Sequence, residues 1–141
     1  MNGQPWHFVV IRNPSIKKQI AEIKNRYCPV EKRAYEADFL EMAPVVVVIC
    51  IDRDRSFDRG IENSVLAAAN LLLAACARGL GGVYMSAYAA NQPGLAEEIT
   101  KTLNIPENIT PVTMIPLGYP DEVPSPKELR PLKEMIHADR F

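Results

Sequence analysis

The sequence contains few side chains that could perform chemistry by themselves. Its two histidines, His7 and His137, lie at opposite ends of the chain, so no Ser-His-Asp or Cys-His arrangement can be recognised. The three cysteines are far apart and lack CxxC spacing, which argues against a zinc site. The glycine-rich run 79–82 follows a predicted helix and precedes a predicted strand, whereas a dinucleotide-binding loop needs the reverse order. Residue types and spacing alone therefore identify no catalytic group.

Length, composition and charge indicate one globular domain over residues 1–141. A formal net charge of −1 argues against nucleic acid or an anionic membrane as a partner. The apolar run 43–51 is too short to cross a bilayer, and we recognise no signal peptide. We expect Cys28, Cys50 and Cys76 to be buried reduced thiols, which suits a cytoplasmic protein.

Capping signals and hydrophobic periodicity predict four helices. Asn13-Pro14 supplies an N-cap followed by proline at the first helical position, and a helix follows as far as Arg26. The longest predicted helix, residues 61–78, is apolar on nearly all faces. We expect it to be buried on all sides, with a second copy of the chain as one source of cover, and to end at Gly79 as the C′ residue. The other predicted helices are residues 31–42 and a segment that opens at Gln92-Pro93 and carries Leu95, Ile99 and Leu103 on one face.

Four β-branched or apolar runs predict the strands: residues 7–11, 44–51, 81–87 (a short strand and loop) and 110–117. Run 44–51 is continuously apolar, which predicts a central strand covered on both faces. Pro116 lies inside the last run, and because proline cannot donate to a ladder, it predicts a sheet edge or a bulge there. These elements indicate an α/β or α+β domain.

Five segments, taken in order, make the sequence resemble the FMN-dependent nitroreductase family. The first is NGQPWHF at residues 2–8, which is similar to the family's N-x-Q-P-W-x-F motif. The others are APVVVVIC at 43–50, AANLLLAACARGLGG at 68–82, PVTMIPLGYP at 111–120 and KELRPLKEMIHADRF at 127–141. Each motif is modest alone, but five collinear motifs from Asn2 to the C-terminus make the resemblance specific.

The resemblance implies an α+β fold, in which a small, mostly antiparallel sheet is flanked by helices, and an intertwined homodimer with FMN at its interface. It also implies an NAD(P)H oxidoreductase, in which NAD(P)H reduces the flavin and a small electron acceptor, such as a nitroaromatic or a quinone, then takes the electrons. The lack of a catalytic triad does not argue against an enzyme, because the cofactor supplies the chemistry. Two alternatives stay open: a specialised relative that dehalogenates or destroys flavin, and a cofactor-free member that acts as a dimeric scaffold or binds a small ligand.

Residue by residue, the resemblance implies five cofactor-binding positions: Asn2, Met85, Ser86, Ala87 and Arg130. Asn2 matches an asparagine that binds the polar edge of the isoalloxazine ring, which suits an amide because it both donates and accepts. Residues 85–87 match a loop whose backbone N–H groups point at the flavin N5 and O4 atoms. Arg130 matches an arginine that pairs with the FMN phosphate. The alternatives are a turn asparagine, an ordinary strand end and a surface cation.

In the family, a further segment with basic side chains for the FMN phosphate precedes the asparagine motif, whereas here that motif begins at Asn2. A misassigned start, a natural truncation and a shortened protein would each give this sequence. Without such a segment we expect weaker FMN binding, because each charge-assisted phosphate contact contributes roughly 1.5–3 kcal/mol. We also expect tighter oligomerisation, which would cover the apolar surface left open.

Overall fold

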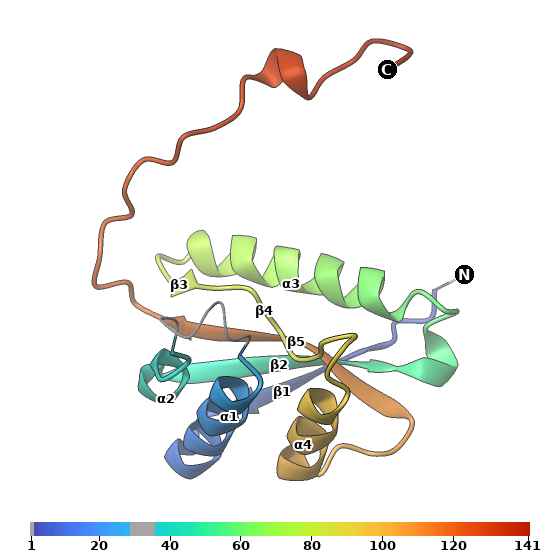
Figure 1. Ribbon diagram of the computed structural model, residues 1–141, viewed down its shortest axis with the longest axis vertical. Coiled ribbons are helices and arrows are strands. Elements are labelled where there is room, and N and C mark those ends of the chain that lie inside the picture. The colour runs from blue at the N-terminus through green and yellow to red at the C-terminus, as the bar shows by residue number, and fades with distance from the viewer. Residues whose placement is uncertain (1, 29–35) are drawn as a thin grey trace.

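An antiparallel sheet forms the centre of the fold in the computed structural model, which describes residues 2–28 and 36–141 (Figure 1). Strand β1 (Trp6–Ile11) pairs with β2 (Val45–Asp52), and β2 pairs with β5 (Ile109–Gly118). The two short strands β3 (Gly81–Gly82) and β4 (Met85–Ser86) follow one another along the outer edge of β5. The sheet order is therefore β1-β2-β5, with β3 and β4 on the far side of β5.

Helices cover the two faces of this sheet unequally. Helices α1 (Pro14–Arg26), α2 (Phe39–Met42) and α4 (Gly94–Leu103) lie on one face, and α3 (Gly60–Cys76) lies on the other (Figure 1). Each face has its own hydrophobic cluster: Ile20, Leu40 and Ile99 pack with Met114 on the first, and Ala68 packs with Val47, Ile49 and Ile115 on the second. The observed α+β architecture, an antiparallel sheet flanked by helices, confirms the predicted fold class.

Local sequence signals placed several elements correctly. Helix α1 has the predicted bounds: the Asn13 side chain accepts a hydrogen bond from the Ser15 N–H at 2.9 Å, and Pro14 occupies the first helical position. Helix α3 ends at Cys76, two residues before the predicted end, and Gly79 follows with a φ of 71°. The Gly79 N–H donates to the Cys76 carbonyl and the Leu80 N–H to the Ala75 carbonyl, which is the pattern of a C′ glycine. The helix predicted over 31–42 begins only at Phe39 among the described residues, and its part over 31–35 lies outside them.

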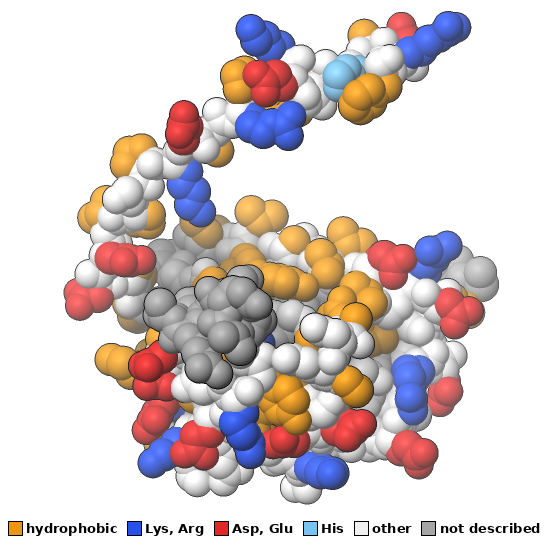
Figure 2. Space-filling view, in the orientation of Figure 1, with side chains coloured by type: hydrophobic (Ala, Val, Ile, Leu, Met, Phe, Trp, Pro, Cys, Tyr) orange, Lys and Arg blue, Asp and Glu red, His pale blue; other side chains and the backbone are white. Residues whose placement is uncertain are grey.

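A single chain covers only one side of α3, so the prediction that this helix is buried on all sides, with a second copy of the chain as one source of cover, stays a prediction. Only Ser64, Ala68 and Ala75 of this helix are buried, all on its sheet-facing side. Apolar side chains also cover the outer side, where Leu66 is 64% and Leu73 is 69% exposed. Figure 2 shows hydrophobic side chains gathered along this part of the surface. In a single chain, α3 therefore has one face on the sheet and a second apolar face that this chain leaves uncovered.

The prediction of an edge or bulge near Pro116 is confirmed only locally: β5 is not an edge strand, but neither β3 nor β4 pairs with Pro116. Pro116 lies in β5, opposite Val46 of the central strand β2, and the register shift falls instead between Ile49 and Cys50, which pairs with Pro111. In the alternation of an antiparallel ladder, the Pro116 nitrogen faces the other neighbour of β5. That position falls between β3 and β4, which pair with β5 at 117–118 and 113–114. The missing N–H thus faces a gap in the ladder, where it costs no strand pairing.

The cysteines correct the expectation of three buried thiols. Cys50 is buried in β2, but Cys28 is half-buried and Cys76 is exposed at the end of α3. Burial raises the pKa of the Cys50 thiol to about 12, because a thiolate would lose its hydration there. No helix within residues 2–28 and 36–141 has the length and apolar character that crossing a bilayer requires.

Residues 119–141 form an exposed tail that leads away from the sheet and carries a single 3-10 turn, Leu132–Glu134 (Figure 1). Large apolar side chains in the tail stand in solvent, among them Val123, Leu129 and Ile136. The apolar side chains of the tail therefore do not pack on the body of their own chain.

Candidate functional site

The outer edge of β4 holds three of the five predicted cofactor-binding residues. Met85 and Ser86 pair with Met114 and Thr113, and the Ala87 N–H donates to the Val112 carbonyl at 2.9 Å. Since alternate residues of an antiparallel strand point toward and away from the partner, Ser86 directs its N–H and its carbonyl away from β5. The Ala87 N–H is engaged within the sheet, so the backbone donor that is directed away from β5 is that of Ser86.

Lys24 of α1 reaches the same edge. Its Nζ donates to the Ser86 carbonyl at 2.9 Å across 62 residues of sequence. Burial lowers the pKa of Lys24, because the ammonium has lost part of its water, and the nearby Cys28 opposes that shift. The Ser86 hydroxyl donates to the Tyr88 carbonyl at 2.6 Å, two residues further along the chain. Ser86 is thus held on its backbone and on its side chain.

Sequence reasoning missed Lys24, although a signal was present. Lys17, Ile20 and Lys24 recur at helical spacing, so two lysines share the inward face of α1 with a fully buried isoleucine. Lys17 is itself buried and donates to the Ala43 carbonyl. A lysine on an apolar face needs a partner, but nothing local indicates that Ser86 would be the partner of Lys24.

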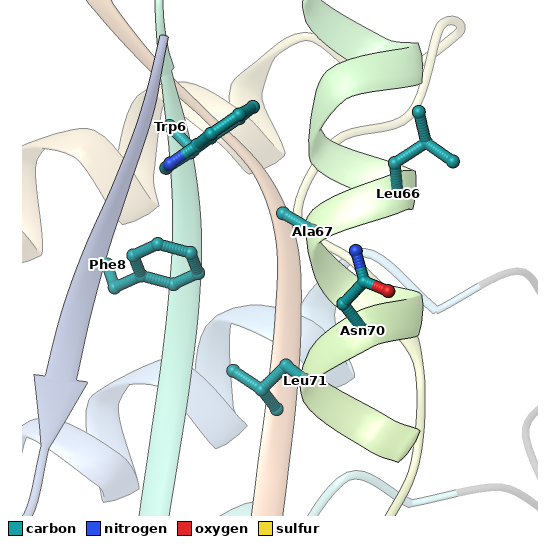
Figure 3. A pocket seen from close by; sticks show the side chains of 6 residues that line it. All are labelled: Trp6, Phe8, Leu66, Ala67, Asn70 and Leu71. Carbon is teal, nitrogen blue, oxygen red and sulfur yellow. The ribbon is translucent and has the colours of Figure 1, made fainter. Parts of the chain in front are cut away.

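A groove lies between helix α3 and strand β1. It has a volume of about 640 Å³ and is lined by Trp6, Phe8, Leu66, Ala67, Asn70 and Leu71. Trp6 and Phe8 extend from β1 toward α3, whose Ala67 and Leu71 face them (Figure 3). The groove is almost entirely apolar, with Asn70 as its one polar side chain among these six.

The remaining predicted residues, Asn2 and Arg130, lie apart from β4. Asn2 is exposed before β1, at the opposite edge of the sheet order from β4. Three strand spacings, about 14 Å, separate these two edges. Arg130 lies in the tail, where its guanidinium donates to the Glu134 carbonyl at 3.4 Å and lies 3.7 Å from that residue's carboxylate. A single chain therefore does not bring Asn2, Ser86 and Arg130 together.

The donor set fits a flavin in part. The outward Ser86 N–H can donate to a ring acceptor, and the exposed Asn2 amide offers both a donor and an acceptor. A phosphate needs cations, and Arg130, the predicted one, belongs to a tail that leaves the sheet. The body of one chain thus offers donors for a ring, whereas the predicted phosphate contact, Arg130, lies in the tail. Among the described residues, no cluster of histidine, cysteine, aspartate or glutamate could hold a metal ion.

Sequence comparison relates this chain to known proteins and to one protein family. A profile of the nitroreductase family matches residues 1–119. A protein from Methanothermobacter thermautotrophicus, provisionally named NADH dehydrogenase/NAD(P)H nitroreductase, is 34% identical over 143 residues, which cover all of this chain and 68% of the relative. An iodotyrosine deiodinase from Thermotoga neapolitana is 29% identical and is aligned with 96% of this chain and 75% of its own length.

The fold of this chain is also similar to solved structures of proteins with related names. A protein from Parabacteroides distasonis, also provisionally named NADH dehydrogenase/NAD(P)H nitroreductase, superposes with a TM-score of 0.82 at 28% identity, over 99% of this chain and 76% of the other. The NADPH:FMN oxidoreductase of Vibrio harveyi, solved with NAD+, superposes with a TM-score of 0.75 at 25% identity, over 99% of this chain and 60% of the other. The chain thus spans between 60% and 76% of these four proteins.

Proposed function

Because this chain belongs to the nitroreductase family, we propose that it is a flavin-dependent oxidoreductase that takes hydride from NAD(P)H and passes electrons to a small acceptor such as a nitroaromatic or a quinone. The observation that carries the proposal is the Ser86 N–H, aimed away from the sheet in a chain of this family. The likeness to an oxidoreductase named for NADPH and FMN supports the choice of cofactor and co-substrate.

Each predicted residue has a role that its chemistry allows. FMN, when bound, supplies the hydride chemistry, and the protein has to orient it and exclude competing reactions. The Ser86 N–H would donate to the ring, and the Asn2 amide would bind the polar ring edge. Met85 and Ala87, which are buried, would support Ser86 from the sheet. Arg130 would pair with the phosphate through its planar guanidinium.

We propose further that two copies of the chain assemble into a homodimer, because the site is incomplete in one copy. The outer side of α3 exposes Leu66 and Leu73, and the groove beside it exposes Trp6 and Phe8. An apolar surface of this extent on a small domain is typical of an interface. A second copy would cover α3 and could bring its own tail, with Arg130, to a site of the first.

Sedimentation of wild-type protein and two variants tests the dimer. We expect twice the chain mass for wild type and a shift toward the monomer for Leu73→Asp, since a carboxylate would be buried without a partner. Met42→Asp is the matched control, because Met42 is 83% exposed on the opposite face of the sheet. A monomeric wild-type protein, or a dimer that Leu73→Asp leaves intact, would contradict this assembly.

Cofactor binding tests the proposed activity. Purified protein, before and after incubation with FMN and gel filtration, should show the visible absorbance of bound flavin. The loaded protein should oxidise NAD(P)H faster when a quinone or a nitroaromatic is added. Protein that retains no flavin at any FMN concentration would instead support the alternative, a cofactor-free member of the family that serves as a dimeric scaffold or binds another small ligand.

Reductive dehalogenation is the second candidate activity. The deiodinase of Thermotoga neapolitana aligns with a larger share of its length than the nitroreductase-named relative does. Both activities need the same flavin and differ in the acceptor. Iodide release from iodotyrosine by the reduced, FMN-loaded protein, compared with reduction of a nitroaromatic, discriminates between them.

A further inference from the structure

The contact between Lys24 and Ser86 joins two elements that the rest of the fold keeps apart. Lys24 lies near the C-terminal end of α1, and Ser86 lies in the outermost strand on the far side of β5. The 2.9 Å hydrogen bond from Lys24 Nζ ends on the carbonyl of the residue whose N–H faces outward. In the part of the chain that the structure describes, no ion pair includes Lys24.

We propose that Lys24 is a positioning residue that fixes the outward-facing Ser86 backbone and places its positive charge beside a flavin bound there, so that the bound flavin is easier to reduce. The proposal rests on the proposed function, because it concerns the FMN site of the same edge. It adds a residue from outside the family motifs quoted above, and it assigns that residue two separable roles, one geometric and one electrostatic.

The geometric role follows from the shortness of β4. Two residues pair with β5 there, so little of the ladder holds Ser86 in place. The Lys24 bond fixes the carbonyl of Ser86, and the hydroxyl bond to the Tyr88 carbonyl fixes its side chain. A donor held in this way is oriented before the ring arrives, which avoids the cost of ordering it on binding.

The electrostatic role follows from the side of the strand that Ser86 presents. The N–H and the carbonyl of one residue in an antiparallel strand point to the same side. A ring atom that accepts from the Ser86 N–H would therefore lie within about two hydrogen-bond lengths, roughly 6 Å, of Lys24 Nζ. Transfer of a hydride to a neutral ring adds two electrons and one proton, so the ring gains one negative charge unless it takes up a further proton.

The size of the effect can be worked from that distance. Opposite unit charges about 6 Å apart, in a partly exposed site with an effective dielectric of about 40, favour the charged state about tenfold. Lys24 should therefore raise the affinity for reduced FMN relative to oxidised FMN about tenfold. For a two-electron couple, a tenfold change in this ratio is about 30 mV in midpoint potential.

Three variants of the full chain separate the two roles. Lys24→Met removes the donor and the charge, Lys24→Gln keeps a donor without the charge, and Lys24→Arg keeps both. Lys18→Met is the matched control, because Lys18 is an exposed lysine of the same helix. We expect the midpoint potential of bound FMN to fall by about 30 mV in Lys24→Met and Lys24→Gln. It should stay near the wild-type value in Lys24→Arg and Lys18→Met.

Amide hydrogen exchange of the flavin-free protein tests the geometric role without any cofactor. Exchange at residues 86–88 should be faster in Lys24→Met than in wild type, and close to wild type in Lys24→Arg and Lys18→Met. Unchanged exchange in Lys24→Met would overturn the geometric role. A circular dichroism spectrum and the exchange of α4 amides confirm that each variant is folded.

The outcomes distinguish this inference from the proposed function. If wild type binds no FMN, the proposed function fails and the electrostatic role fails with it, while exchange still decides the geometric role. If wild type binds FMN and all three Lys24 variants keep its potential, the proposed function stands and the electrostatic role of Lys24 is overturned. A lowered potential in Lys24→Arg as large as in Lys24→Met would also overturn it.

Discussion

The contact between Ser64 of α3 and Thr113 of β5 provides a quantitative test of how this helix is held on the sheet. Their hydroxyl oxygens lie 3.0 Å apart, and both residues are fully buried. Either oxygen can be the donor. Thr113 is also the strand partner of Ser86, so the contact lies under the candidate site.

Removing one hydroxyl should cost more than removing both. Thr113→Val keeps the shape of the side chain but leaves the Ser64 hydroxyl buried without its partner, which costs about 2 kcal/mol. For a chain of this length, that loss lowers Tm by about 7 °C. Ser64→Ala should have a similar effect. The double variant replaces the polar pair by two apolar groups, so it should be destabilised by much less than the sum, with a coupling of about 1–2 kcal/mol.

Urea unfolding of the four proteins, followed by circular dichroism at one fixed chain concentration, measures the cycle. A fixed concentration is needed because assembly of the chain would make the apparent stability depend on it. Ser125→Ala, in the exposed tail, is the control and should leave the free energy of unfolding unchanged. Additive effects of the two single substitutions would refute the reasoning, since they would show that the hydroxyls do not depend on one another.

Three further predictions concern other parts of the fold. In native protein at mildly alkaline pH, a thiol reagent should label exposed Cys76 within the mixing time and buried Cys50 only after unfolding, because burial raises the pKa of Cys50 to about 12. Rapid native labelling of Cys50, located by peptide mapping, would contradict this. The pKa of Lys24 is lowered below 10.5 in the folded state, so the unfolded chain binds more protons between the folded pKa and 10.5. The unfolding free energy of wild type minus that of the Lys24→Met variant should therefore rise with pH across that window, and a flat or falling difference in urea titrations would refute the assigned shift. Gly82→Ala should cost about 1–3 kcal/mol, because a Cβ there would lie 2.8 Å from Leu117 Cδ2 and 3.0 Å from the backbone oxygen of Pro116, and a Tm unchanged in calorimetry would show that this edge repacks freely.

Local signals in the sequence were sufficient wherever neighbouring residues determine the structure. Asn13 and Pro14 predicted the first residue of α1, because capping and a fixed φ act within one turn. The apolar run 44–51 predicted a buried strand, since each side chain has to leave water whichever face it points to, and residues 46–51 are buried. The five collinear motifs identified the family and with it the class of fold.

Two predictions made from a single segment depended on how that segment pairs or packs with the rest of the fold. Pro116 predicted an edge because proline cannot donate. The strand has partners on both sides, and the prediction holds only locally, at the point where β3 has ended and β4 pairs elsewhere. The all-round apolarity of α3 predicted burial on all sides with a second copy as one source of cover, and a single chain covers one side only. Neither the gap beside Pro116 nor the open side of α3 is encoded by the residues at those positions.

The sequence by itself determined most of the helices and strands, which faces are apolar, and which family the chain resembles, because periodicity, capping and motif spacing act over short stretches. Only the tertiary structure decided that the Ala87 N–H donates to the Val112 carbonyl and that the Ser86 N–H points away from β5. It also decided that Lys24 of α1 donates to the Ser86 carbonyl. These facts depend on strand order and register, which bring together residues as far as 62 positions apart. Hydrogen bonds over such separations form only once the whole sheet and its flanking helices are packed.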